Sequence, residues 1–176
     1  YRRHLRDPAR YAAWPKYNLL RHAGAIYALA QVRELRRSKR LDGAIVAAAG
    51  YLRTFVADGP PECDCRAIWS DYARVDPRNA LRRPAIKLGG QGLGLVALTA
   101  AATVDASAAP LGELRAIGRC ILWMQREDGS FRSKYVEVLG FSSWVSLYYP
   151  GEAALGLVRL AKLTGEDRWR QAARDA

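Results

Sequence analysis

The side chains best suited to acid–base chemistry are two carboxylates in the second half of the chain. Glu152 falls in the first turn of an expected helix, directly after Pro150 and Gly151, and Asp128 lies in an Asp-Gly turn. Two such groups can act as general acid and general base, so Glu152 and Asp128 are the candidate catalytic residues. Both positions also have structural explanations, because a first-turn Glu stabilises its helix and Asp-Gly is a common tight turn.

A histidine and a pair of tyrosines are candidate ligand-binding side chains. His22 follows Arg21 on an apolar helix, where it can serve as a base, bind an anion or be a satisfied core residue. Tyr148 and Tyr149 precede the expected helix start at Pro150. In an extended segment their rings point to opposite faces, so we expect one of them to contact a ligand.

The three cysteines do not follow a familiar spacing. Cys63 and Cys65 are separated by Asp64, and Cys120 stands apart. Because this fits neither a two-pair zinc site nor a disulfide framework, we expect small, partly buried thiols. The metal alternative is zinc on this Cys-Asp-Cys segment with His22 as nitrogen ligand, but adjacent ligands reach one ion awkwardly. We therefore predict no metal site and no cofactor.

Composition bounds the class of protein. The chain has 176 residues, half of them hydrophobic, which suits a single domain over residues 1–176 with its own core. Lys and Arg number 28 against 17 Asp and Glu, and this net charge of +11 implies affinity for anionic ligands. Only five of the 28 are Lys, an Arg excess that a GC-rich coding background also produces. Without a compact basic-aromatic motif, the sequence does not favour nucleic acid as a partner.

The sequence carries few signs of where the protein resides. No run of 18 apolar residues occurs, so we predict no membrane span. Neither a signal peptide nor an initiator Met is present, and the start at Tyr1 indicates a processed or truncated chain. We favour a secreted or periplasmic location slightly over a cytoplasmic one.

Hydrophobic periodicity predicts a mainly helical chain with two extended interruptions. Residues 1–16 predict an irregular or short-helical lead-in. The helices are expected over these residues: 17–31, 41–57, 91–103, 111–124, 150–163 and 166–176. Between them, residues 62–88 predict two short strands around a turn at 76–79, laid over one end of the helices, and residues 131–147 predict an extended stretch.

Three of these helices share a pattern that indicates a repeat. The helices at 17–31, 91–103 and 150–163 are apolar and rich in small residues. Each begins at a short turn-like segment, and the starts lie roughly 60–70 residues apart. Each precedes a more amphipathic helix. We interpret the order as three α/α hairpins, each with an apolar inner helix and an amphipathic outer one. Gly92 and Gly94 predict a close approach between the second inner helix and its neighbours.

Three segments carry a resemblance to known families. Residues 121–131 resemble the Gln-to-aromatic turns of α/α toroids of the squalene-cyclase and prenyltransferase-like type. The helix start at residues 148–157 and the turn at 163–169 resemble six-hairpin glycosidase-type toroids. That superfamily includes glycoside hydrolases, polysaccharide lyases and sugar epimerases.

The resemblance implies a mainly α fold in which α/α hairpin repeats form part of a toroid. Short β-hairpin excursions are expected around residues 66–88 and 131–147. The chain supplies about three of the six hairpins of such a ring, so we expect a partial ring or a truncated chain. Because the last helix is expected to end at Ala176 without a cap, we predict that this edge of the chain is apolar and packs against a missing half-ring or a second copy of the chain.

The resemblance also places a binding site. Such toroids hold their substrates at one mouth of the ring, where the segments before the inner helices converge. Aromatic, acidic and cationic side chains are usual in sugar sites. The substrate-binding residues that this implies are Asn18, Arg21, His22, Lys87, Gln91, Tyr148 and Tyr149, with Tyr17 beside them. Lys87 has two interpretations, a contact to an acidic sugar or a solvated strand end.

We therefore expect a carbohydrate-active domain that binds or processes a poly- or oligosaccharide by hydrolysis, lyase action or epimerisation. Whether it is an enzyme, for example of the glycoside hydrolase type, stays open at this point. The main alternative is a non-catalytic helical binding or scaffold module that engages a partner through its unfinished edge. A terpenoid or prenyl-type toroid ranks last, because an acidic Asp-x-Asp-Asp cluster for ionising such a substrate is absent.

Overall fold

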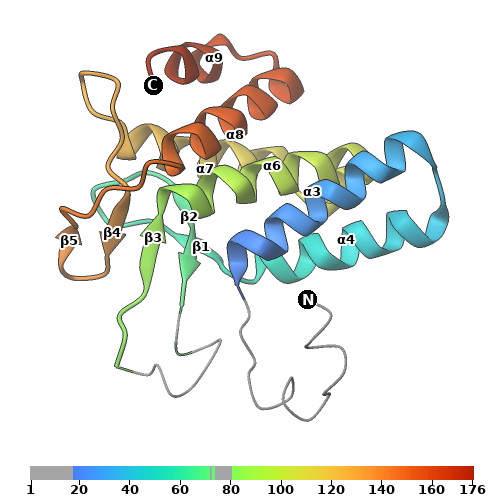
Figure 1. Ribbon diagram of the computed structural model, residues 1–176, viewed down its shortest axis with the longest axis horizontal. Helices are drawn as coiled ribbons and strands as arrows, with labels where there is room; N and C mark the ends of the chain where they lie inside the picture. The colour runs from blue at the N-terminus through green and yellow to red at the C-terminus, as the bar shows by residue number, and fades with distance from the viewer. Residues whose placement is uncertain (1–17, 72, 74–80) are drawn as a thin grey trace.

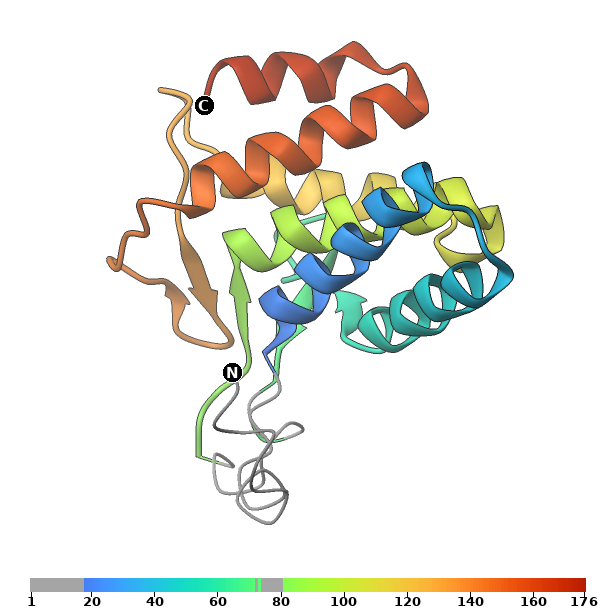
Figure 2. The ribbon, with the colours of Figure 1, turned by 45° about the vertical axis from the view of Figure 1, so that its right-hand side comes forward.

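The helices are arranged in two layers in the computed structural model, which describes residues 18–71, 73 and 81–176. The inner layer holds three helices that run side by side in the same direction: α3 (Leu19–Leu35), α6 (Leu88–Val104) and α8 (Tyr149–Thr164) (Figures 1 and 2). Three helices run back in the opposite direction on the outside of these: α4 (Lys39–Arg53) beside α3, α7 (Leu111–Met124) behind α6 and α9 (Asp167–Arg174) beside α8. The predicted mainly α fold with short β hairpins is confirmed. The ring itself stays a prediction.

Parts of the predicted chain cannot be compared with the structure. The lead-in over residues 1–16, the candidate Tyr17 and the turn at residues 76–79 lie outside the described residues.

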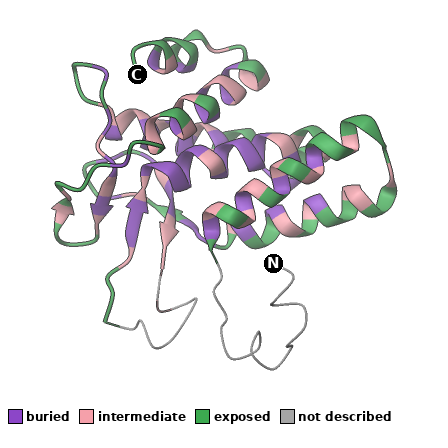
Figure 3. Ribbon diagram, in the orientation of Figure 1, coloured by how far each residue is buried: buried purple, intermediate pink, exposed green. Residues whose placement is uncertain are grey.

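Helix α6 is the central element of the core. Of its 17 residues 12 are buried, so it is covered on nearly every side, and the short 3-10 helix η2 (Ala106–Ala108) follows it (Figure 3). Helices α3 and α8 pack on its two flanks. They are also joined directly, because Arg159 of α8 donates a hydrogen bond to the Tyr27 hydroxyl of α3 and lies 5.1 Å from the centre of that ring.

Glycines set the spacing between α6 and its neighbours, as the sequence predicted. A Cβ atom added to Gly92 would overlap the backbone carbonyl of Glu152, and one added to Gly94 would overlap the Ile68 side chain. From the facing helix, a Cβ at Gly156 would lie 2.7 Å from the Gly92 carbonyl oxygen. The absence of side chains therefore lets the backbones of α6 and α8 touch.

Five short strands form an antiparallel sheet in sequence order at the end of the helical layers. They are β1 (Val56–Asp58), β2 (Arg66–Ser70), β3 (Ala85–Lys87), β4 (Lys134–Val136) and β5 (Gly140–Phe141). Because β3 leads directly into α6, the sheet lies at the N-terminal end of the inner helices (Figure 1). The strands expected around residues 66–88 and 131–147 are confirmed, although the second pair is short.

Three predicted helix boundaries are wrong by three or more residues. The helix expected over residues 17–31 continues to Leu35. The helix expected over residues 41–57 ends at Arg53, because Val56 leaves it to pair with Ile68 as the start of β1. Phe55 and Val56 are apolar, and a short apolar run fits a helix end and a strand equally well. Gly89 and Gly90 were expected to precede the third helix, but they lie in the first turn of α6.

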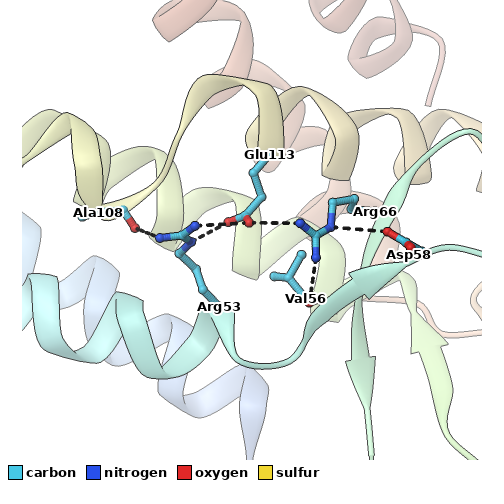
Figure 4. A network of polar contacts seen from close by, with 6 residues as sticks. All are labelled: Arg53, Val56, Asp58, Arg66, Ala108 and Glu113. Atoms are coloured by element: carbon cyan, nitrogen blue, oxygen red, sulfur yellow. Dashed lines mark hydrogen bonds and ion pairs between the residues drawn. The ribbon is translucent and has the colours of Figure 1, made fainter.

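A charged network ties the outer layer to the sheet (Figure 4). Arg53 of α4 donates to both carboxylate oxygens of Glu113 on α7, at 2.6 and 3.3 Å, and to the Ala108 carbonyl at 3.3 Å. Arg66 of β2 lies 3.7 Å from the same carboxylate and donates to the Val56 carbonyl. The Glu113 side chain is only 11% exposed, so one nearly buried acid holds two arginines from different elements.

Among the described residues, no helix combines the length and the apolar character that crossing a membrane requires.

Candidate functional site

The starts of the three inner helices lie together at the sheet end of the molecule (Figure 2). Helices α3 and α6 meet there, since a Cβ added to Gly90 would lie 3.8 Å from Leu19 and 3.9 Å from the Lys87 side chain. Helices α6 and α8 meet at Gly89, as described next. The fold thus places the predicted site residues at the starts of α3, α6 and α8 at the sheet end of the molecule. Their side chains point in different directions.

Glu152 is the site candidate with the most unusual surroundings. A Cβ atom at Gly89 would overlap its Oε2 atom, so the carboxyl group lies directly on the first turn of α6. Oε2 is buried and has no hydrogen-bond partner among the described residues. Burial raises the pKa of Glu152 above its ordinary value of 4.5. A carboxyl group with a raised pKa can hold a proton for general acid catalysis near neutral pH.

Tyr149 packs against Gly89, as the Glu152 carboxyl group does. Its ring would also be overlapped by a Cβ at Gly89, and it meets the Trp144 ring edge-on at 5.6 Å. Trp144 is half exposed and was not singled out from the sequence. Helix α8 starts at Tyr149, so the two tyrosines are not in an extended segment: Tyr149 is partly buried beside Glu152, whereas Tyr148 faces solvent.

The three candidates at the start of α3 have different surroundings. Asn18 is the N-cap of α3, and its side-chain oxygen accepts a hydrogen bond from the Arg21 backbone at 3.0 Å. Arg21 is exposed. His22 turns toward α4, where its Nε2 lies 2.9 Å from the Ala48 carbonyl oxygen and its ring lies 5.6 Å from Tyr51. This direction favours the satisfied-histidine interpretation.

Gln91 and Lys87 come from the junction of β3 and α6. The buried Gln91 side chain accepts from the Ile68 backbone N–H at 2.8 Å and donates to the Ile68 carbonyl at 2.7 Å. It also donates to the Lys87 carbonyl at 3.4 Å. These hydrogen bonds join the first turn of α6 to the backbone of β2. Lys87 is the partly buried N-cap residue of α6.

Asp128 forms hydrogen bonds with Ser130 in its own turn. Its carboxylate accepts hydrogen bonds from the Ser130 backbone and hydroxyl, at 3.0 and 2.6 Å, and these bonds lower the pKa of Asp128. The turn packs on the end of α9, since Gln125 donates to the Ala172 carbonyl. No contact among the described residues joins Asp128 to Glu152, which lies against the start of α6.

A groove separate from the Glu152 region lies on the face of the sheet that points away from α6. Neighbouring strand residues point to opposite faces, and Ile68 faces α6, so Trp69 faces the other way. It lines a groove of about 600 Å³ with Tyr135, Asp58 and Glu137. Burial, followed by the carboxylates of Glu62 and Glu137, raises the pKa of Tyr135.

The groove residues are spread over strands that are far apart in sequence. Trp69 and Tyr135 both pair with Ile86, one on each side of β3, so the register aligns them in one cross-strand row. Aromatic residues in predicted strands were the only available signal, and they did not reveal which strands pair.

The cysteine prediction is corrected by the structure. Cys63 and Cys65 are both buried and form a disulfide with each other, so they are neither free thiols nor zinc ligands. Their Cα atoms lie 5.2 Å apart. Cys120 is a buried free cysteine, and burial raises its pKa to about 12. Within the described ranges, no cluster of three or more His, Cys, Asp or Glu side chains is arranged to hold a metal ion.

Comparisons with known proteins add a likeness in fold. No family model matches the sequence. No curated protein matches it either. Among solved structures, a sugar epimerase from a ruminal bacterium is similar, with a TM-score of 0.64 at 14% identity. The match covers 88% of this chain and 39% of the epimerase, so the chain spans about two fifths of that protein's length.

Proposed function

We propose that the chain is a carbohydrate-active domain whose ligand site lies where Glu152, Tyr149 and Trp144 meet the start of α6. The observation that carries this proposal is the Glu152 carboxyl, whose Oε2 atom is buried and has no hydrogen-bond partner among the described residues. An unpaired buried carboxyl lowers stability, and such groups are characteristic of functional sites. The similarity in fold to a sugar epimerase supports the same class of ligand.

The residues at this site suit the two requirements of a sugar ligand. Aromatic rings stack on the apolar face of a pyranose, and Tyr149 with the half-exposed Trp144 offers two of them. Burial raises the pKa of Glu152. When protonated, its carboxyl group can donate a proton to a sugar oxygen, and when deprotonated it can act as a base toward carbon or water. These roles serve hydrolysis, lyase action or epimerisation.

The rest of the site is proposed to come from a larger ring. The fold match covers 39% of the epimerase, and the chain forms about three hairpins. We infer that a missing half-ring, or a second copy of the chain, supplies further walls around the ligand.

The test is a turnover and binding assay with neutral and uronic oligosaccharides on the protein that carries this chain. Glu152→Gln is expected to reduce turnover by on the order of 100-fold while the fold is retained. Asp128→Asn is the matched carboxylate control and is expected to have little effect, because Asp128 already caps its own turn. Full activity of Glu152→Gln on a confirmed substrate would falsify the assignment.

A non-catalytic saccharide-binding module is the second candidate function. The observation in its favour is the separate groove of about 600 Å³ that Trp69 and Tyr135 help to line. This candidate is favoured if the protein binds a saccharide without converting it, and if Trp69→Ala abolishes that binding whereas Glu152→Gln retains it. Conversion of the saccharide favours the enzyme.

A further inference from the structure

We propose that the Cys63–Cys65 disulfide is a reversible redox site that exchanges with small thiols or with the dithiol of a partner protein. This inference is independent of the proposed carbohydrate site. It rests on the position of the pair in the chain, on the backbone that surrounds it and on the charges beside it.

The position of the disulfide leaves it little to contribute as a structural cross-link. A disulfide stabilises a protein mainly by restricting the unfolded chain, and the effect grows with the length of the loop that it closes. Here a single residue, Asp64, separates the two cysteines. Two cysteines so close in sequence restrict the unfolded chain very little, so structural stabilisation is a weak reason for this bond.

The backbone holds the two cysteines in place without help from the sulfur atoms. The Cys63 N–H donates to the Pro60 carbonyl at 2.8 Å, and the Cys65 N–H donates to the Cys63 carbonyl at 2.7 Å. The Gly59 N–H donates to the Cys65 carbonyl at 2.9 Å. Because these bonds do not involve sulfur, the turn is expected to survive reduction. Both thiols then stay adjacent, which favours rapid reoxidation.

The surroundings of the pair are open on one side and contain cations. Cys63 and Cys65 line a groove of about 420 Å³ together with Arg66 and Arg119, and with the exposed carboxylates of Asp58 and Asp64, which lie 3.8 Å from Arg66 and 3.7 Å from Arg119. Arg119 donates to the Asp64 carbonyl at 2.6 Å, so its guanidinium group is held at the turn. Nearby cations favour the thiolate form of a cysteine, which is both the nucleophile and the better leaving group.

The exchange balances as two ordinary thiol–disulfide steps. A small thiolate attacks one sulfur of the pair, the Cys63–Cys65 bond breaks, and the other cysteine leaves as a thiolate. A second small thiolate then attacks the mixed disulfide and releases the first cysteine. Two small thiols are oxidised to one disulfide, and the protein pair is reduced to two thiols. Cys120 is too deeply buried to take part.

The test is thiol trapping of the full chain in glutathione buffers of graded composition. Free thiols are alkylated with N-ethylmaleimide and counted by mass spectrometry, and circular dichroism follows the fold. The pair is expected to titrate as a two-electron couple within the range of cellular glutathione mixtures, with the fold retained and full recovery on reoxidation. Cys120→Ser, the control, is expected to titrate identically.

The guanidinium at the turn offers a second measurement. Arg119→Ala is expected to slow reduction by glutathione about threefold to tenfold, because the leaving thiolate loses a stabilising cation. The exposed Arg126→Ala serves as the matched control and is expected to leave the rate unchanged. A pair that stays oxidised in the most reducing buffer, never oxidises, or unfolds the chain when reduced would overturn the proposal.

Discussion

At the scale of single residues, Glu152 and Gln91 show two different environments of a buried polar atom. The Gln91 side chain makes its hydrogen bonds to backbone atoms of Ile68 and Lys87, whereas the Oε2 atom of Glu152 has no hydrogen-bond partner in the described part of the chain. The sequence could mark both as polar positions near helix starts. It could not separate them, because their partners, Ile68 and Gly89, are set by how β2 and α8 pack on α6.

The raised pKa of Glu152 predicts a pH-dependent stability. The folded chain binds this proton more tightly than the unfolded chain, so the contribution of Glu152 is full below its ordinary pKa of 4.5 and is lost as pH rises through the raised value. Glu152→Gln is therefore expected to gain stability relative to the wild type as pH rises from 4 to 8. Urea unfolding at several pH values measures the difference, and a flat difference contradicts the burial of this carboxyl.

Gln91→Leu is expected to lower the free energy of unfolding by about 2–4 kcal/mol, because the buried Ile68 N–H and C=O both lose their partner. The exposed Gln171→Leu provides the control, with an expected change within about 0.5 kcal/mol. Thermal and urea unfolding measure both. An unchanged stability in Gln91→Leu, together with weaker saccharide binding, restores the direct substrate contact that the sequence predicted.

At the scale of elements, the sequence located most helices and missed one strand. Helix α7 was predicted at its observed bounds, because its apolar face repeats regularly between Pro110 and a polar turn. Strand β1 was hidden inside an expected helix end, since its pairing partner β2 lies beyond a proline-rich connection. The local hydrophobic pattern was therefore enough to predict the long helices. Strand pairing depends on contacts between residues far apart in sequence, which a local pattern does not reveal.

The contact between α6 and α8 predicts a strong effect at a single glycine. Gly92→Ala is expected to destabilise the protein by about 3 kcal/mol, because the new Cβ overlaps the Glu152 backbone and forces the helices apart. Gly43→Ala is the matched control in an exposed helix position with open space around it, and a gain of about 0.5–1 kcal/mol is expected. Chemical denaturation distinguishes the two, and equal effects contradict the close packing.

The charged network predicts a graded response to loss of charge. Glu113→Gln is expected to cost about 2 kcal/mol, because Arg53 and Arg66 lose one nearly buried partner. Asp58→Asn, at the exposed end of the same network, is expected to change stability by less than about 0.5 kcal/mol. Thermal unfolding tests both variants, and an equal response would show that the network acts only at the surface.

At the scale of the whole molecule, the repeat predicted the inner and outer layers, whereas the location of the site stays a prediction. The starts of α3, α6 and α8 lie at one end of the molecule, where Glu152 and Tyr149 both lie against Gly89. His22 and Asp128 turn elsewhere, to α4 and to the end of α9, because side-chain direction depends on helix rotation and turn bonding. Trp144 and the Trp69–Tyr135 groove depend on packing between distant segments, and sequence pattern did not reveal them.

The most direct test of the proposed site is a crystal structure of the protein soaked with an oligosaccharide that it binds. The predicted result is a sugar ring stacked on Tyr149 or Trp144, with a hydroxyl or glycosidic oxygen within hydrogen-bond distance of Glu152. A sugar seated instead in the groove of Trp69 and Tyr135, with nothing bound beside Glu152, would contradict it.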